Sequence, residues 1–164
     1  MTSGTALGEV RPEHDPDGVP TELMQLYYQR GFAVPVVDLW ELITEPAGLS
    51  RWFGTMTGDP AGGHVTITTV DEPARTVVVD VVACTSPHLL DLTIADAVVE
   101  IRLHQVGVVT TLEVVRRHLE RSEVAEVGPY WQFHLDRLAA ATEDRDMPHW
   151  PAYTDLAAEY PCPG

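Results

Sequence analysis

The pattern of apolar and polar residues between positions 55 and 118 predicts a series of short strands. Apolar side chains recur at every second position, which is the period of a strand with one buried and one solvated face. Leu90, Leu92 and Ile94, for example, are separated by single polar residues. Sequences rich in glycine, proline and aspartate interrupt this alternation at short intervals. Brief turns of that kind favour an antiparallel meander.

Two short helices are predicted before these strands. The spacing i, i+3, i+4 and i+7 defines the buried face of the first, which carries Val36, Leu39, Trp40 and Ile43. Pro35 fits the first turn of this helix. The second helix is expected to begin near Pro46 and to end at Gly54, with the hydroxyl of Thr44 capping its free backbone N–H groups.

A long helix is predicted after the strands. Trp131, Leu135 and Leu138 share one apolar stripe. Because proline is tolerated only in the first turn of a helix, Pro129 places the expected start near Gly128. A sheet with one apolar face needs a cover, and this helix is the largest element available, so we expect it to lie across the sheet.

The remaining segments complete a single-domain organisation, as expected for 164 residues. Residues 1–20 are rich in glycine, proline and acidic residues, which is typical of a flexible leader. Residues 21–32 fit a first strand. Residues 21–145 are expected to form the folded domain, and residues 146–164 a tail whose short helix docks on it.

Charge narrows the classes of partner. The formal net charge is −15 at pH 7, and all ten basic residues are arginine. Nucleic acid and anionic membrane surfaces are therefore disfavoured, since both are bound through basic faces. No apolar run approaches the roughly 20 residues of a membrane helix, and no secretory signal is evident at the N-terminus. A homodimer, or a basic protein partner for an acidic face, stays open.

Cysteines, histidines and loop motifs give no sign of a metal or cofactor. Cys84 and Cys162 lie far apart, which fits two free thiols in a reducing cytoplasm. The seven histidines contain no HxxxH spacing and no close Cys/His pair. There is no glycine-rich phosphate loop and no nucleophile elbow. We therefore expect no metal, no cofactor and a cytoplasmic location.

The order of the elements is that of a helix-grip fold. This is an α+β architecture with a curved antiparallel sheet of about seven strands around a long C-terminal helix. Two short helices follow the first strand. Within this order, residues 39–46 and Trp52-Phe53-Gly54 resemble the opening motif of bacterial homologues of the heat-shock-protein-90 ATPase activator. These homologues belong to the START-like (SRPBCC) superfamily, which also contains polyketide cyclases and lipid-transfer domains.

Other segments extend this resemblance over residues 21–160. Residues 60–63 resemble the glycine hairpin of the family, and Trp131 with residues 135–138 resembles its final helix. Trp150, Tyr153 and Tyr160 resemble the aromatic tail of many bacterial members. Residues 32–35 depart from the family, because they lack its Pro-x-Glu-x-Val lead. The eukaryotic activators use an additional domain on their chaperone, so chaperone activation does not follow from the fold alone.

The resemblance implies an apolar cavity between the sheet and the long helix. The apolar residues expected to line or close it are Trp40, Trp52, Phe53, Val99, Ile101, Leu103, Leu112, Val114, Trp131, Leu135 and Leu138. Such a cavity would hold a lipid-like, aromatic or polyketide-like molecule. From the residue pattern alone, the same side chains could instead fill a closed core.

Two polar side chains are candidates for chemistry in this cavity. His134 follows Trp131 by three residues, and it could hydrogen-bond a ligand or act as an acid or base near neutral pH. Arg116 shares the strand parity of Leu112 and Val114, so a regular strand would point it inward, where it could bind a carboxylate or phosphate. A bulge would turn it to solvent instead. Neither residue is assigned a catalytic role.

Three functions are compatible with these observations. A non-catalytic binding module for a small hydrophobic molecule is the preferred hypothesis, because the residues that the motifs are expected to contribute to the cavity wall are apolar. An enzyme of the cyclase, dehydratase or hydrolase type could use the same cavity through His134 or Arg116. A co-chaperone-like interaction domain could use the acidic surface.

Overall fold

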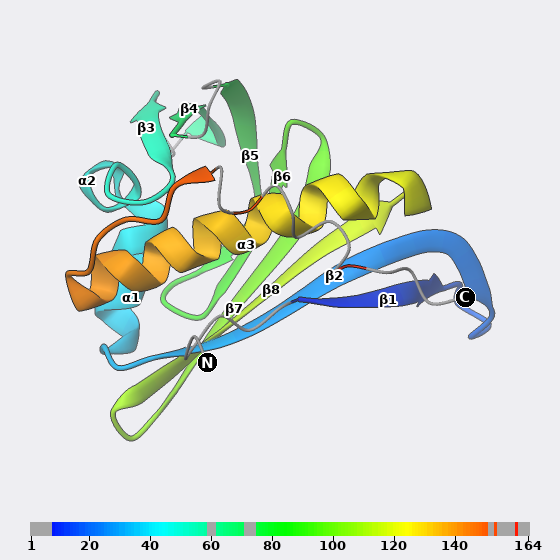
Figure 1. Cartoon of the computed structure of the whole chain (residues 1–164), viewed down its shortest axis with the longest axis horizontal. Coiled ribbons are helices and arrows are strands. Elements are labelled where there is room, and N and C mark those ends of the chain that lie inside the picture. Colours follow the sequence, from blue (N-terminus) through cyan, green and yellow to red (C-terminus); the bar gives the residue numbers. More distant parts are fainter. Residues whose placement is uncertain (1–7, 59–61, 71–74, 151–152, 154–159, 161–164) are drawn as a thin grey trace.

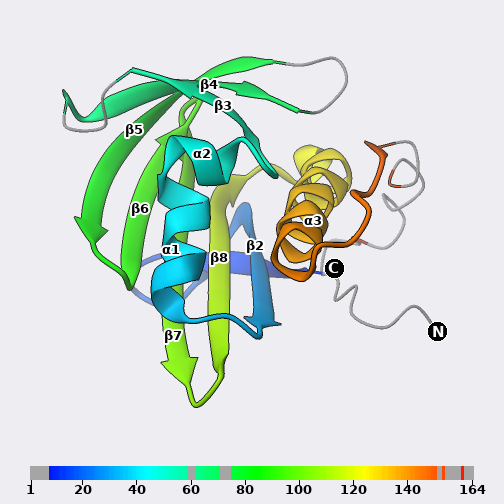
Figure 2. The same ribbon diagram turned by 90° about the vertical axis from the view of Figure 1, so that its left-hand side faces the viewer.

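The structure, a computed structural model, describes residues 8–58, 62–70, 75–150, 153 and 160. In this part of the chain, one antiparallel sheet of eight strands curves around three helices (Figure 1, Figure 2). The strands are β1 (Glu9–His14), β2 (Pro20–Phe32), β3 (Gly54–Thr57), β4 (His64–Thr69), β5 (Thr76–Thr85), β6 (Leu89–Ile94), β7 (Ala97–Val106) and β8 (Val109–Leu119). The helices are α1 (Val36–Thr44), α2 (Pro46–Leu49) and α3 (Arg121–Glu143). This is the predicted α+β helix-grip architecture.

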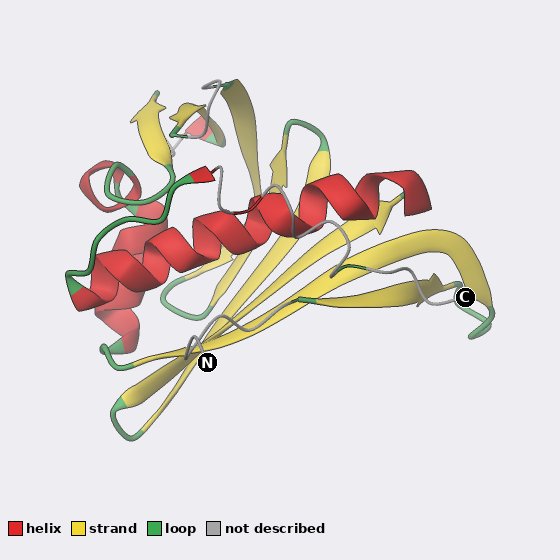
Figure 3. Ribbon diagram, viewed as in Figure 1, coloured by secondary structure: helices red, strands yellow, loops and turns green. Residues whose placement is uncertain are grey.

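The order of the strands in the sheet is β1-β2-β8-β7-β6-β5-β4-β3. Strands β3 to β8 form the predicted meander, and β2 pairs with β8 (Figure 3). The sheet has eight strands rather than about seven, because residues 9–14, which we expected in a flexible leader, pair with β2 as β1. The side chains of β1 are exposed or half-buried, so this edge strand leaves little apolar signal in the sequence.

Helix α1 forms as predicted, with Leu39 and Trp40 on its buried face. Its N-cap residue is Pro35, one position before the predicted first turn. Thr44 does not cap α2, because its hydroxyl donates to the carbonyl oxygen of Trp40 at 2.7 Å and Glu45 occupies the N-cap position. A threonine in the last turn of one helix can satisfy a carbonyl of that turn, which removes it as a cap for the next.

Helix α3 begins at Arg121, about two turns before the predicted start at Gly128. Glu120 and Glu123 form a capping box that satisfies free N–H groups of the first turn. Pro129 therefore lies inside the helix, where its ring removes one backbone hydrogen bond. None of the helices in the described part of the chain has the length and apolar character needed to cross a membrane.

Helix α3 is buried on two sides. One side, which carries Leu138, packs into the hydrophobic core beneath the sheet. On another side, Phe133 contacts Trp150 and Tyr153 with ring centroids 5.4 and 5.3 Å apart. The aromatic tail thus covers the helix. Tyr153 and Tyr160 are described, whereas the short helix expected between them lies outside the described residues.

A buried ion pair joins α3 to the sheet. Arg30 of β2 and Asp136 of α3 lie 2.6 Å apart (Nη1 to Oδ1), with side chains only 7% and 12% exposed. The other carboxylate oxygen of Asp136 accepts a hydrogen bond of 2.6 Å from the Tyr153 hydroxyl. Burial and this bond raise the pKa of Tyr153, so the hydroxyl stays protonated and can donate. The pair therefore links β2, α3 and the tail.

A second polar link lies earlier in the helix, one turn before Asp136 at Gln132 and two turns before it at Gly128. The Tyr28 hydroxyl donates to the Gly128 carbonyl oxygen at 2.7 Å, and the Tyr160 hydroxyl donates to Gln132 Oε1 at 2.6 Å. The backbone N–H of Gly8 donates to the Tyr160 hydroxyl at 3.2 Å. Burial raises the pKa of both tyrosines, which keeps these hydroxyls neutral. Tyr28 and Arg30 are two apart on the inner face of one strand, so α3 is held at two points along β2.

Gly128 allows the Tyr160 ring to lie directly on α3. A Cβ at this position would stand 2.5 Å from the ring, closer than atoms can approach. Helix interiors normally prefer alanine to glycine by about 1 kcal/mol. At this position, the close approach of the aromatic ring reverses that preference.

We therefore expect Gly128→Ala to lower the free energy of unfolding by about 1–3 kcal/mol, as an overpacking substitution does. In a Tyr160→Ala background the ring is gone, and the same substitution should stabilise the protein. Chemical denaturation of the two single variants and the double variant measures both effects. Stabilisation by Gly128→Ala in the wild-type background would contradict this account.

Candidate functional site

The main cavity lies between the two short helices and strands β3 to β7. Its volume is about 230 Å³, and its walls come from α1, α2, the segment that follows α2, and the inner faces of these strands. Among the described residues that line it, all except Thr44 and Cys84 are aliphatic, aromatic or methionine. The site is therefore a small container with an apolar wall.

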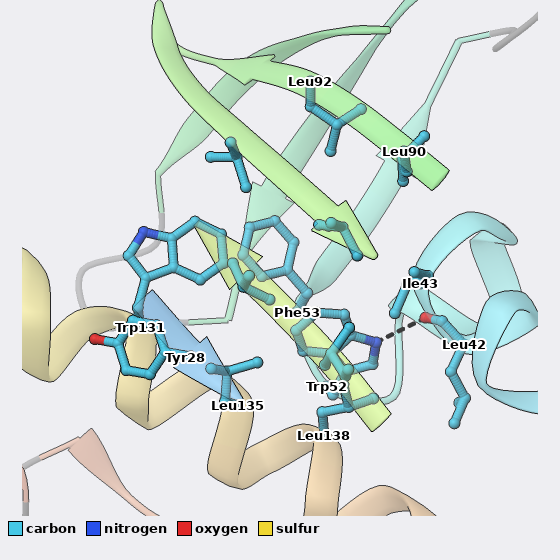
Figure 4. Packing of buried hydrophobic residues seen from close by; sticks show 14 of the residues in the cluster. Tyr28, Leu42, Ile43, Trp52, Phe53, Leu90, Leu92, Trp131, Leu135 and Leu138 are labelled. Carbon is cyan, nitrogen blue, oxygen red and sulfur yellow. Dashed lines mark hydrogen bonds between the residues drawn. The ribbon is translucent and has the colours of Figure 1, made fainter. Parts of the chain in front are cut away.

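The floor of the cavity is formed by neighbouring strands in matched register. Leu90 and Leu92 of β6 point inward, and Leu92 pairs with Val81 of β5 and with Val99 of β7. Leu90 and Leu92 project from the sheet toward α3 and α1 in Figure 4. Because successive residues of a strand alternate between its faces, these positions define one continuous apolar surface.

A β-bulge places Cys84 at the cavity. The pairing of β5 with β6 shifts between Val81 and Ala83, so Val82 is an extra residue and is 67% exposed. After the shift, Cys84 pairs with Leu90 and lines the cavity, although strict alternation from Val81 would turn it to the outer face. The thiol is exposed and free, which places it at the open side of the cavity.

Trp52 and Phe53 close the side of the cavity below the short helices. The indole Nε1–H of Trp52 donates to the carbonyl oxygen of Leu42 at 2.7 Å, which is drawn as a dashed line in Figure 4. This bond satisfies a carbonyl in the last turn of α1, and it fixes the segment after α2 against that helix. The rings of Trp52 and Phe53 contact each other with centroids 5.4 Å apart. The closing wall is therefore held by packing and by one buried hydrogen bond.

Helix α3 contributes only Trp131 to the lining of this cavity. Along its backbone, the helix approaches β2 more closely than any other strand. Its side chains therefore fill the space above β2 and β8, and the space above β4 to β6 is left to α1, α2 and Trp131. The cavity lies beside the long helix, under the short ones, and not along the length of α3 as we expected.

The predicted site residues fall into several groups. Four of them line the main cavity: Trp52, Phe53, Ile101 and Trp131. Seven are buried in the hydrophobic core outside this lining: Trp40, Val99, Leu103, Leu112, Val114, Leu135 and Leu138. For these seven, the structure matches the closed-core alternative, because they pack in the core where α3 approaches β2 and α1 approaches β7. His134 and Arg116 lie elsewhere.

His134 is fully buried and does not line the main cavity. Its ring contacts Tyr130, Phe53 and Phe133, with centroids 4.5, 4.8 and 5.1 Å apart. It thus lies behind Phe53 as seen from the cavity. A histidine enclosed by three aromatic rings packs the molecule, and this position offers a ligand in the cavity no direct contact.

Arg116 points to the inner side of the sheet, as its strand parity predicts. It pairs with Leu26 of β2 and with Val99 of β7, and both of these side chains are fully buried. Arg116 lines a second pocket, a groove of about 490 Å³ under the first half of α3. The residue therefore faces inward but reaches a different compartment from the main cavity.

Sequence reasoning missed most of the cavity wall. Val79, Val81 and Cys84 of β5 line it, and so do Leu90 and Leu92 of β6. Their alternation was visible, but the space above these strands depends on where α3 settles. Among the described residues, no three His, Cys, Asp or Glu side chains are grouped so that they could hold a metal ion.

The fold resembles that of several solved structures. CalU16 from Micromonospora echinospora matches in a crystal structure with a TM-score of 0.72, 23% identity, and coverage of 93% of this chain and 92% of that chain. Its solution NMR structure matches with a TM-score of 0.68, 27% identity, and coverage of 98% and 86%. DynU16, described as a protein in the dynemicin biosynthetic locus, matches with a TM-score of 0.63, 22% identity, and coverage of 76% and 48%. Among curated proteins, none matches the chain.

The family is shown by the sequence itself. The sequence model of the family described as "Activator of Hsp90 ATPase homolog 1-like protein" matches residues 33–143, which run from the start of α1 to the end of α3. The chain belongs to this family, and its helix-grip fold is that of the START-like superfamily. The resemblance inferred from the two tryptophan-bearing motifs is confirmed.

The Trp52 hydrogen bond makes a testable contribution to the cavity wall. We expect Trp52→Phe to lower the free energy of unfolding by about 1–3 kcal/mol, because it leaves the buried Leu42 carbonyl without its donor. Trp40→Phe is the matched control, since the Trp40 indole N–H makes no hydrogen bond within the described part of the chain. Equal losses for the two variants in urea denaturation would show that the bond contributes nothing beyond buried area.

Proposed function

We propose that this protein binds a small, mostly apolar molecule in the main cavity and does not transform it. The observation that supports this proposal is the cavity itself, which stays open inside a well-packed domain and has an almost entirely apolar wall. Apolar pockets with few polar groups are typical of small-molecule binding sites.

The volume limits the size of the ligand. An apolar cavity of about 150 Å³ can hold benzene. The present cavity of about 230 Å³ therefore suits a compact body of one or two fused rings, or a short branched chain. A long acyl chain would exceed it unless the chain continued beyond the cavity. Within the expected range of lipid-like, aromatic and polyketide-like molecules, we favour compact aromatic ones.

Apolar burial alone gives modest affinity. A ligand body that buries about 250 Å² of apolar surface gains about 6 kcal/mol at roughly 25 cal/mol per Å². Before any cost of association, this corresponds to a dissociation constant of about 40 µM. Tight binding by this cavity would require a further, polar contribution from outside it.

One of the solved structures with a similar fold supports a role in small-molecule metabolism. DynU16 is described as a protein in the dynemicin biosynthetic locus. By analogy, we infer that the ligand is an aromatic or polyketide-like metabolite. This analogy rests on fold likeness, which fixes architecture and not activity.

The other functions considered from sequence receive no specific support. Catalysis by His134 on a ligand in the cavity would require contact, and His134 lies outside the lining and behind Phe53. A co-chaperone-like role rests on the family description alone. Neither is therefore our proposal.

A filled cavity should not bind a ligand. Val81 lines the cavity and is half-buried, so Val81→Trp can place its indole in the vacant space. We expect this variant to lose at least about 10-fold in affinity for 2-naphthol, measured by isothermal titration calorimetry, with its fold retained by circular dichroism.

Val82→Trp is the matched control, because Val82 is the next residue and points outward at the bulge. It should bind 2-naphthol like the wild type. Equal binding by both variants would place the ligand outside this cavity, and no binding by the wild type would contradict the proposed function.

A further inference from the structure

The second pocket adjoins the main cavity. Two residues, Ile94 of β6 and Trp131 of α3, line both. The remaining walls of the second pocket come from Arg75 and the start of β5, the β6–β7 turn, Arg116 of β8, the first half of α3, and Trp150 after α3. Trp131 thus lies between the apolar main cavity and the second pocket, whose wall includes both apolar and charged residues.

The inner face of β5 runs from one compartment to the other. Val77 lines the second pocket, whereas Val79 and Val81 line the main cavity. Because a strand rises about 3.3 Å per residue, Val77 and Val81 lie about 13 Å apart. A molecule with a one- or two-ring body and a short side chain has the length to occupy both compartments.

Among the charged side chains that line the second pocket, Arg116 is the one best placed to bind an anionic group of a ligand. It is half-buried, between the fully buried Leu26 and Val99, and burial lowers its pKa. One of its guanidinium nitrogens donates to the backbone carbonyl of Arg117. Within the described residues it forms no ion pair. A guanidinium carries five N–H donors, so most of its donors remain available for a planar anion.

Other charges compete for Arg116, because the carboxylates of Glu123 in this pocket and of Glu13 outside it interact with it electrostatically and partly offset the effect of burial on its pKa. Arg75 and Glu126 are exposed, and water screens exposed charges effectively. The carboxylate of Glu123 accepts a hydrogen bond of 2.9 Å from the Glu120 backbone N–H, which holds it at the helix terminus. The two glutamates nevertheless repel anions, so a singly charged group suits the pocket better than a doubly charged phosphate.

We propose that the two compartments form one site for an aromatic carboxylate, whose ring body occupies the main cavity and whose carboxylate binds Arg116 in the second pocket. This inference rests on the proposed function, because it requires a ligand in the main cavity. It supplies the polar contribution that apolar burial lacks. Trp131 contacts the ligand where the ring body meets the side chain.

The test compares two probes that share a ring body and linker and differ in the end group, which is an anionic carboxylate in one and a neutral alcohol in the other. These are 3-(2-naphthyl)propionate and the corresponding alcohol, 3-(2-naphthyl)propan-1-ol, titrated calorimetrically into the full-length protein at low ionic strength. We expect the wild type to bind the carboxylate about 10-fold more tightly than the alcohol, as charge-assisted hydrogen bonds allow. Arg116→Met should abolish this preference, because it weakens binding of the carboxylate much more than binding of the alcohol.

Arg117→Met is the matched control. Arg117 is the next residue, its Nη2 lies 2.9 Å from Glu100 Oε1, and its Nη1 donates to Gln25 Oε1 at 2.8 Å. It should keep the wild-type preference for the carboxylate. Arg116→Lys retains the charge without the planar fork, so it should show an intermediate preference and serves as the second variant if Arg116→Met does not fold.

The outcomes separate this inference from the proposed function. If the alcohol binds and Val81→Trp blocks it, the proposed function holds. Equal affinity for both probes would then overturn the two-compartment site alone. Loss of the carboxylate preference in Arg75→Met but not in Arg116→Met would overturn the assignment to Arg116. Tighter binding of 3-(2-naphthyl)propylammonium than of the carboxylate would assign the pocket to cations through its glutamates.

Discussion

The attachment of α3 to β2 determines the rest of this structure. Arg30 and Asp136 form a buried ion pair, and Tyr28 donates to the backbone of α3 two helical turns earlier. Removing one partner of such a pair typically costs about 3–5 kcal/mol, because the other charge stays buried alone. Polar interactions therefore hold α3 against β2 at two points along the strand. The tail adds a third layer, since Tyr153 donates to the same aspartate.

This one-sided attachment divides the inner face of the sheet into two regions. Above β2 and β8, the side chains of α3 fill the space, and Leu135 and Leu138 are buried in a packed core. Above β4 to β6 the helix is too distant to fill the space. The short helices α1 and α2 cover this region instead, and the cavity remains between them and the sheet. Trp131 stands at the boundary of the two regions, which explains why it lines both pockets.

The sequence was sufficient for the architecture and insufficient for the position of the cavity. The alternation of β6 and the parity of Arg116 were correctly predicted, because both depend on local strand geometry. The orientation of Cys84 could not be predicted from alternation, because a bulge inserts Val82 and reverses the parity after it. The apolar stripe with Leu135 and Leu138 was also predicted correctly. The pattern of apolar residues alone, however, does not show whether such a stripe packs against other side chains or lines a cavity. That distinction depends on Arg30 and Asp136, a pair whose partners are 106 residues apart in the chain.

The position of the cavity is the central claim, and methyl NMR tests it most directly. With 13C-labelled Leu, Val and Ile methyl groups, titration with 2-naphthol should shift the signals of Leu90, Leu92 and Ile101, which line the cavity. The signals of Leu112, Leu135 and Leu138, which lie in the packed half, should stay in place. Larger shifts for Leu135 and Leu138 than for Leu90 and Leu92 would mean that the ligand binds along α3, which would contradict the account.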